Sequence, residues 1–514
     1  MPRALVLVLS SVLALSACSS APASWRQVVA PTPPAAVPAT TPAAVAAASR
    51  APAVAAPPPA RLVWKGCGGG FQCSTLQVPL DDAAPAKATI ALALTRTLAT
   101  SPKARIGSLI VNPGGPGASA VAFLKAAAAD IPVEVRARFD LVAFDPRGVG
   151  GSAPIRCATT AQLDRYFHLD PAPTDAAGLA ALEAGNRAFA AGCTQRSGQV
   201  LSHVSTVEAA RDMDRVRAAV GDERLTYLGY SYGTAIGTAY LEQFPTRVRA
   251  MVLDGPLDPT LTWDRLLAGQ SAGFDIALKA YLADCQRTAC AFRRAVQGNL
   301  GAAYDALAAK LKRRPLPGDA TRTVGPGEFS LGVGVGLYDK QDGWPAISAG
   351  LAAAVRGQGA VLLALSDSYL ERTKAGYDNQ NEANFAVNCI DRPWPREEAP
   401  YLALAKRVGR SYPRFGPSIV LSGLGCAVWP VPPVSRPHAV TGAGAPTVVV
   451  VGTTRDPATP YVWAQGLAKQ LAKAVLLTHE GDGHTAYRAS ARACLTAPID
   501  AYLLTGKAPA EATC

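Results

Sequence analysis

The sequence has 514 residues, of which 49% are hydrophobic, and its formal net charge is +12. A chain of this length folds into one large domain with a substantial insertion, or into two domains, and its apolar residues are sufficient for a sizeable core. Its Lys and Arg residues are scattered and form no dense basic run. The net charge is therefore interpreted as a property of the surface or of solubility. The scattered distribution argues against a nucleic-acid-binding protein, which usually has a dense basic patch.

The N-terminus has the pattern of a bacterial export signal. Arg3 precedes an apolar stretch, residues 4–17, that is too short to cross a bilayer but suits the core of a signal peptide. Residues 15–18 read Leu-Ser-Ala-Cys, and small residues directly before a cysteine resemble a lipobox. We expect a lipoprotein signal over residues 1–18, with Cys18 acylated and the protein anchored to the outer face of the cell membrane. The alternative is an ordinary signal peptide and a secreted protein.

The next segment, residues 19–60, consists almost entirely of Ala, Pro, Ser, Thr and Val. It has no apolar periodicity that could build a packed core. We expect a disordered, extended linker that separates a globular domain from the lipid anchor.

The remaining ten cysteines are an even number in a chain expected to be exported, which favours disulfides over metal ligands. No C-x-x-C pair occurs, which weakens a zinc or redox interpretation. Pairing neighbours along the chain closes the shortest loops, although sequence alone leaves other connectivities open. The pairs expected on this basis are Cys67–Cys73, Cys157–Cys193, Cys285–Cys290, Cys389–Cys426 and Cys494–Cys514.

Strand-like runs alternate with helical patterns at both ends of the globular part. The runs are residues 74–80, 88–95, 108–111, 139–144, 225–228, 250–253, 447–451 and 475–477. Several are continuously apolar, which is typical of a sheet covered on both faces. The alternation predicts an α/β fold with a mostly parallel central sheet. Its core comprises residues 61–255 and 445–514, and the mainly helical residues 256–444 are expected to form a cap or lid.

A Gly-x-Ser-x-Gly pattern at residues 229–233 follows the strand at 225–228 and precedes a helical run, 234–243. A nucleophilic serine needs such a tight strand-to-helix turn, and flanking glycines remove side chains that would clash across it. The helix also directs its positive end towards a developing oxyanion. We predict Ser231 as the nucleophile.

The histidine of a serine hydrolase with this fold follows the nucleophile and the acid along the chain. The sequence has five histidines: His168, His203, His438, His479 and His484. Chain order excludes the first three. His479 lies on a predicted strand, whereas His484 lies in the loop after it beside a glycine. We therefore predict His484 as the general base.

The acid is expected just after the strand at 447–451, where Asp456 lies. It would hold the His484 imidazole in the tautomer that deprotonates the serine. Asp482 is only two residues from His484 and is badly placed to reach the far ring nitrogen. Asp254, at a strand end used by some hydrolases, is interpreted as structural.

An oxyanion hole requires two backbone N–H donors. The first is predicted to be that of Tyr232, directly after the nucleophile. The second is predicted to be that of Gly115, in the glycine-rich loop 112–117 after an early strand. The loop 145–152, after the next strand, is interpreted as a scaffold that buttresses the site.

These motifs together resemble the secreted tripeptidyl aminopeptidase family, relatives of the proline iminopeptidases among the α/β-hydrolases. The resemblance rests on N-P-G-G-P-G at Asn112, D-P-R-G-V-G at Asp145, G-Y-S-Y-G-T at Gly229, L-D-G at Leu253, D-P-A-T-P at Asp456, G-D-G-H at Gly481 and F-A-V-N-C-I-D at Phe385. It covers the chain from about Trp64 to the C-terminus. It implies the α/β-hydrolase fold and release of short peptides, expected to be tripeptides, from free N-termini. The partners are then peptide substrates, and we expect a monomer with no metal or organic cofactor.

Two rival functions remain open. An esterase or lipase would use the same triad, and a non-catalytic surface-binding lipoprotein could retain the fold. An aminopeptidase differs from both because its pocket must pair the ammonium group of the substrate with a carboxylate. Glu382 and Asp391, which flank the stretch ending at Cys389-Ile390 in the predicted cap, are the residues expected to supply it.

Overall fold

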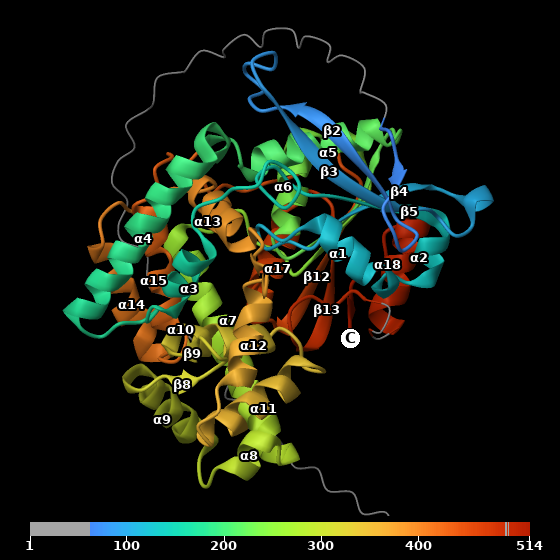
Figure 1. Ribbon diagram of the computed structural model, residues 1–514. Helices are drawn as coiled ribbons and strands as arrows, with labels where there is room; N and C mark the ends of the chain where they lie inside the picture. The colour runs from blue at the N-terminus through green and yellow to red at the C-terminus, as the bar shows by residue number, and fades with distance from the viewer. Residues whose placement is uncertain (1–61, 489–490, 492) are drawn as a thin grey trace, which may run out of the picture. The chain divides into compact units, whose positions relative to one another are not determined.

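The computed structural model describes residues 62–488, 491 and 493–514. Cys18, the predicted signal and the predicted linker lie outside these residues. The described chain is built on a ten-stranded sheet with the order β1-β2-β3-β5-β4-β6-β7-β12-β13-β14 (Figure 1). The strands are β1 (Lys65–Gly66), β2 (Gln72–Pro79), β3 (Thr89–Thr97), β4 (Gly107–Asn112), β5 (Phe139–Phe144), β6 (Leu225–Tyr230), β7 (Val248–Asp254), β12 (Val448–Arg455), β13 (Ala474–Asp482) and β14 (Ala512–Thr513).

The sheet is parallel from β5 through β4, β6, β7, β12 and β13 to β14. Only the edge formed by β1, β2 and β3 is antiparallel. All six residues of β4, of β5 and of β6 are buried, as the continuous apolar runs predicted. The predicted α/β-hydrolase fold with its mostly parallel sheet is confirmed.

Helices cover both faces of the sheet. They are α1 (Ala120–Ala127), α2 (Val133–Arg138), α5 (Thr206–Ala219), α6 (Gly233–Gln243), α17 (Tyr461–Gln470) and α18 (Ala493–Thr505). On one face, Ile110 of β4 packs in a core with residues of α5, α6 and α17. On the other face, Leu109 and Val111 pack with residues of α1, α2 and α18. The alternation along β4 follows from the two-residue period of a strand.

A long helical region lies between β7 and β12. It contains α7 (Trp263–Thr288), α8 (Ala291–Ala295), α9 (Leu300–Arg313), α10 (Pro326–Gly336), α11 (Gly343–Val355), α12 (Ala360–Tyr369), α13 (Gln380–Ile390), α14 (Ala399–Ser411), α15 (Gly416–Ser422) and α16 (Leu424–Ala427). Two short ribbons, β8 (Leu316–Pro317) with β9 (Thr323–Val324) and β10 (Arg372–Thr373) with β11 (Gly376–Tyr377), interrupt it. This region has a hydrophobic core of its own, formed mainly by α7 and α9 to α12.

Two helices from the N-terminal half join this helical region. They are α3 (Thr160–His168) and α4 (Ala176–Ser197), inserted between β5 and α5. The first contacts α10 and the second contacts α16, and Figure 1 shows both among the helices of the inserted region. The predicted division assigned them to the core because their helical pattern does not reveal which layer they join.

Five disulfides link neighbouring cysteines along the chain. They are Cys67–Cys73, Cys157–Cys193, Cys285–Cys290, Cys389–Cys426 and Cys494–Cys514. The fourth joins α13 to α16, and the second joins the segment before α3 to α4. Within the described ranges, none of the helices combines the length and hydropathy that a bilayer-spanning segment requires.

Candidate active site

Ser231 lies at the sharp turn between β6 and α6. Its φ is +52°, in the left-handed region that non-glycine residues rarely adopt. The Ser231 N–H donates to the Asp254 carbonyl at 2.9 Å. A Cβ added to Gly233 would lie 2.6 Å from the Asn112 carbonyl oxygen, and one added to Gly229 would lie 2.7 Å from the Gly233 oxygen. The turn therefore tolerates only glycine at both positions, and it presents a half-buried serine above the sheet.

His484 and Asp456 meet beyond the carboxyl ends of the neighbouring parallel strands β12 and β13. The Nδ1 atom of His484 lies 2.9 Å from each carboxylate oxygen of Asp456. That carboxylate also accepts bonds from the Ala458 and Thr459 N–H groups and from the Thr459 hydroxyl, at 2.8–3.0 Å. Asp456 is 2% exposed. These contacts fix the carboxylate, and through it they fix the orientation of the imidazole ring.

The opposite ring nitrogen of His484, Nε2, is buried and has no hydrogen-bond partner among the described residues. The His484 ring packs against Gly255, next to the serine turn. A Cβ added to Gly255 would lie 3.3 Å from His484 Cε1, and the preceding residue, Asp254, accepts the Ser231 N–H. Burial lowers the pKa of His484, but the charge and hydrogen bond of Asp456 outweigh it, so the pKa is raised above its ordinary value.

The two other acids considered for the site have different contacts. Asp254 is fully buried, and its Oδ2 accepts the N–H groups of Ala486 and Tyr487 at 2.8 and 2.7 Å. It therefore holds the backbone of the loop after His484, and burial raises its pKa to about 6. Asp482 forms ion pairs with Arg455 and Lys340. His479 lies on β13, paired in register with Thr453.

The glycine-rich loop after β4 closes against the serine turn. Gly114 has a φ of +99°, and a Cβ there would lie 2.8 Å from the Tyr232 nitrogen and 2.9 Å from Ser231 Cβ. Gly115 follows with a φ of +107°. Within the described ranges, neither the Tyr232 nor the Gly115 N–H donates to a protein group. Both N–H groups are therefore available to a ligand. The close approach of the loop to the serine turn requires glycine.

The two carboxylates expected to bind an amine have partners within the protein. Glu382, on α13, is 1% exposed, accepts the N–H groups of Cys157 and Ala158, and lies 3.6 Å from Arg156. Asp391, which caps the C-terminus of α13, is half-buried and accepts both the N–H and the hydroxyl of Thr206. Burial raises the pKa of Asp391 to about 6.

Several residues of the helical region contact this site, and no sequence motif predicted these contacts. The carbonyl of Tyr338 accepts the His484 N–H at 2.8 Å. Lys340 Nζ lies 2.7 Å from the carboxylate of Asp482, the last residue of β13. Asn384 of α13 donates to the Pro116 carbonyl at 3.0 Å. Their only sequence signal was the proximity of Asn384 to the family-like string that begins at Phe385.

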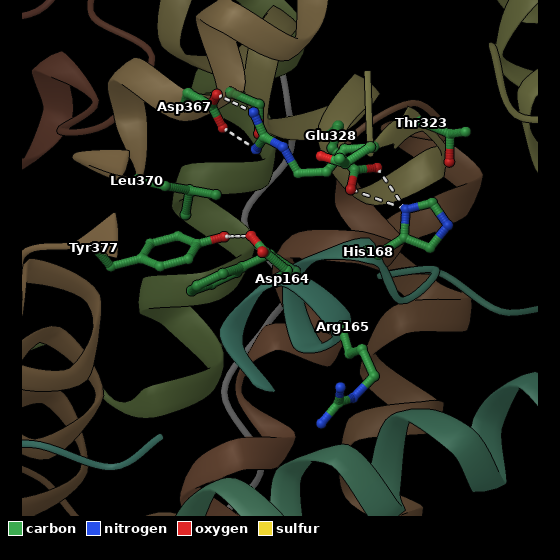
Figure 2. A pocket seen from close by; sticks show the side chains of 12 residues that line it. Asp164, Arg165, His168, Thr323, Glu328, Asp367, Leu370 and Tyr377 are labelled. Carbon is green, nitrogen blue, oxygen red and sulfur yellow. Dashed lines mark hydrogen bonds and ion pairs between the residues drawn. The ribbon is translucent and has the colours of Figure 1, made fainter. Parts of the chain in front are cut away.

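A separate cavity of about 210 Å³ lies in the helical region between α3, α10 and α12. Most of the charged side chains that line it are paired with one another. Figure 2 shows Tyr377 directed at Asp164, the Asp367 carboxylate bonded to a guanidinium, and His168 facing Glu328. The guanidinium is that of Arg322, 2.7 Å from Asp367. None of Ser231, Asp456 and His484 lines this cavity, and its ion pairs brace the helices that surround it. No cluster of three or more metal-binding side chains occurs in the part of the chain that the structure describes.

Comparison with known proteins decides the family. Residues 412–514 match the family described as TAP-like protein. The chain is 39% identical to serine protease Hip1 of Mycobacterium tuberculosis over 86% of both chains. It is 38% identical to carboxylesterase B of the same species over 85% of both chains. It is 32% identical to tripeptidyl aminopeptidase of Streptomyces lividans, over 88% of this chain and 87% of that one. The chain belongs to the TAP-like family of serine hydrolases.

Membership of the TAP-like family confirms the resemblance that the sequence motifs indicated, and with it the class of enzyme, a serine hydrolase. The relatives include a protease, a carboxylesterase and an aminopeptidase. Family membership alone therefore does not determine the substrate.

Proposed function

We propose that this TAP-like hydrolase is an exported serine exopeptidase that releases tripeptides from free N-termini. The observation that carries the proposal is the arrangement of its polar groups. A serine held at a positive φ follows β6, and an imidazole lies 2.9 Å from a fully hydrogen-bonded carboxylate at the neighbouring strand ends. The 32% identity to a tripeptidyl aminopeptidase supports the substrate class.

In the proposed reaction, the Ser231 hydroxyl attacks the scissile carbonyl carbon while His484 Nε2 accepts its proton. Asp456 stabilises the imidazolium that results. The N–H groups of Tyr232 and Gly115 hold the oxyanion of the tetrahedral intermediate. The imidazolium then protonates the leaving amine, and water attacks the acyl-enzyme in the reverse sequence to release the peptide acid.

An exopeptidase must also recognise the substrate's ammonium group, and its distance from Ser231 sets the length of the released peptide. Burying that charge requires a carboxylate partner. Glu382 and Asp391 are the two candidate carboxylates for this role, of which one is required. Both N–H groups that bond to Glu382 donate to Oε1, so its buried Oε2, 3.6 Å from Arg156, is the oxygen that an ammonium would approach. Asp391 is half-buried, and both of its oxygens accept from Thr206.

The proposal is tested with tripeptidyl coumarin amides that carry either a free or an acetylated N-terminus. We expect the free-amine substrate to be cleaved with a kcat/KM at least 100-fold higher, about 3 kcal/mol for an unpaired charge. Equal cleavage of the two substrates would contradict the exopeptidase assignment and favour an endopeptidase or esterase.

A second candidate function is an esterase that uses the same triad. The 38% identity to a carboxylesterase specifically favours it. An esterase requires only an apolar acyl pocket, so it would cleave neutral short-chain esters far faster than any peptide amide. Comparing kcat/KM for a short-chain ester with that for the free-amine peptide distinguishes the two functions.

The site of action is proposed to be the outer face of the cell membrane. The five disulfides indicate an oxidising, extracytoplasmic compartment. The lipobox-like Leu-Ser-Ala-Cys at residues 15–18 supports acylation of Cys18. The apolar lipid would retain the protein without a membrane-spanning helix.

A further inference from the structure

Helix α13 packs directly on the glycine-rich loop that contains Gly115. A Cβ added to Gly117 would lie 2.1 Å from the Gln380 carbonyl oxygen and 3.0 Å from the Asn384 nitrogen. The Asn384 Nδ2 donates to the Pro116 carbonyl at 3.0 Å. The Pro116–Gly117 peptide, in the same loop as Gly115, is therefore held by a side chain of the helical region.

The orientation of this asparagine amide is set by a second asparagine one turn further along α13. The Nδ2 of Asn388 donates to the Asn384 Oδ1 and to its backbone carbonyl, both at 3.0 Å. Because the Asn384 Oδ1 is thus used as an acceptor, its Nδ2 is the atom that faces Pro116. The two residues form a short hydrogen-bonded relay that ends on the loop.

The opposite end of α13 is linked through Thr206 to the side chain of Tyr232, whose backbone N–H is the other proposed donor. The hydroxyls of Tyr232 and Thr206 lie 2.6 Å apart. The Thr206 hydroxyl and N–H both donate to the Asp391 carboxylate. An ionised carboxylate only accepts, so the Thr206 proton points to Asp391 and the Tyr232 hydroxyl donates to Thr206. Asp391 thereby holds the side chain of the residue directly after Ser231.

Helix α13 is attached to its surroundings at both ends. At its N-terminus, Asn379 bonds to Gly148, Gly150 and Ile155. One turn later, the Glu382 carboxylate accepts the N–H groups of Cys157 and Ala158. At the C-terminal end, Cys389 is joined to α16 by a disulfide. A helix fixed in this way can impose its geometry on the groups that it contacts.

We infer that α13 sets the geometry of the oxyanion hole, with Asn384 and Asp391 as positioning residues for the Gly115 and Tyr232 donors. Neither side chain touches the substrate carbonyl in this arrangement. Asn384 acts through the loop, by holding the Pro116 carbonyl, and Asp391 acts through the Thr206 hydroxyl and the Tyr232 side chain. The inference rests on the proposed roles of Ser231 and the two donors, but it is independent of whether the substrate is a peptide.

The test measures kcat and KM of the full-length enzyme on a small neutral ester, which has no amine. Removing one oxyanion donor typically lowers kcat by about 100-fold or more, so displacing one is expected to lower it by roughly 10-fold. We expect this loss for Asn384→Ala and Asp391→Asn with KM unchanged, because the donors act on charge that develops in the transition state. Asn381→Ala is the matched control, since Asn381 lies on the same helix and its side chain, among the described residues, bonds only to the Leu370 carbonyl.

Thr206 provides a second, more conservative pair of variants. Thr206→Val removes the hydroxyl between Tyr232 and Asp391 and is expected to lower kcat as Asp391→Asn does. Thr206→Ser keeps the hydroxyl and should restore wild-type kcat. This pair tests the contact between Asp391 and Tyr232 even where Asp391→Asn fails to fold, which thermal unfolding would reveal.

Two results would overturn the inference. One is wild-type kcat on the ester for Asn384→Ala and Thr206→Val. The other is an Asp391→Asn variant that is impaired only on free-amine peptides, which would make Asp391 the amine partner. Failure of the exopeptidase proposal alone would instead appear as equal cleavage of free and acetylated peptides, with the ester results unchanged.

Discussion

The Tyr338 ring meets the His484 imidazole edge-on, with ring centroids 5.0 Å apart. Its carbonyl accepts the His484 N–H at 2.8 Å. Two ion pairs, Lys340–Asp482 and Arg488–Asp339, join the segment after Tyr338 to the chain on either side of His484. The inserted helical region therefore helps to hold the proposed catalytic histidine in place.

Replacing Tyr338 by Ala is expected to loosen the His484 ring and lower kcat by roughly 10-fold, because a reacting group must be held within a fraction of an ångström. Tyr338→Phe is the control, since it keeps the aromatic ring and the backbone contact. Steady-state kinetics on one substrate measure both variants. A Tyr338→Ala enzyme with wild-type kcat would show that the ring contact has no positioning role.

The raised pKa of His484 predicts the pH dependence of the enzyme. The histidine must be neutral to accept the Ser231 proton, so activity is lost as pH falls through its pKa. We expect the acidic limb of the kcat/KM profile to have its midpoint above about 6.5, the ordinary histidine value. Asp456→Asn removes the charge that raises the pKa, so the midpoint of its residual activity should move to lower pH. A wild-type midpoint below 6 would contradict the proposed pair.

The disulfides Cys389–Cys426 and Cys285–Cys290 offer a matched comparison of stability. They join cysteines 37 and 5 residues apart. In the chain-entropy account, a longer closed loop gives more stabilisation, about 4 kcal/mol against about 2 kcal/mol here. Denaturant unfolding of the two double Cys→Ser variants should show the larger loss for Cys389–Cys426. Equal losses would mean that loop closure does not determine the effect.

Cys18→Ser tests the proposed lipid anchor. The variant is expected to leave the membrane fraction and appear as soluble protein with unchanged specific activity, because residues 19–60 separate Cys18 from the folded domain in the sequence. Fractionation of cells and culture medium, followed by an activity assay, measures this. Retention of the variant on membranes would show that another feature tethers the protein.

The sheet and the proposed triad could be predicted from sequence because local physical constraints determine them. Strands such as β4 and β6 are continuously apolar because both faces of the sheet are covered. The turn at Ser231 requires glycine on both sides. His484 followed from the small number of histidines and from their order along the chain.

The contacts made by the helical region could not be predicted in the same way. Tyr338 and Asn384 are ordinary helix or turn residues, and only the tertiary arrangement brings them to His484 and Pro116. The membership of α3 and α4 in this region was missed for the same reason. The sequence also could not show that Glu382 accepts two backbone N–H groups, since their donors lie more than 220 residues earlier.

The most direct test of the central claim is covalent labelling by a fluorophosphonate, with the modified residue located by peptide mass spectrometry. We expect one labelled residue, Ser231, in the wild-type enzyme, no labelling of Ser231→Ala, and strongly slowed labelling of His484→Ala. Both variants should unfold at the wild-type temperature. Labelling of Ser231→Ala at the wild-type rate, or of a different residue in the wild type, would contradict the account.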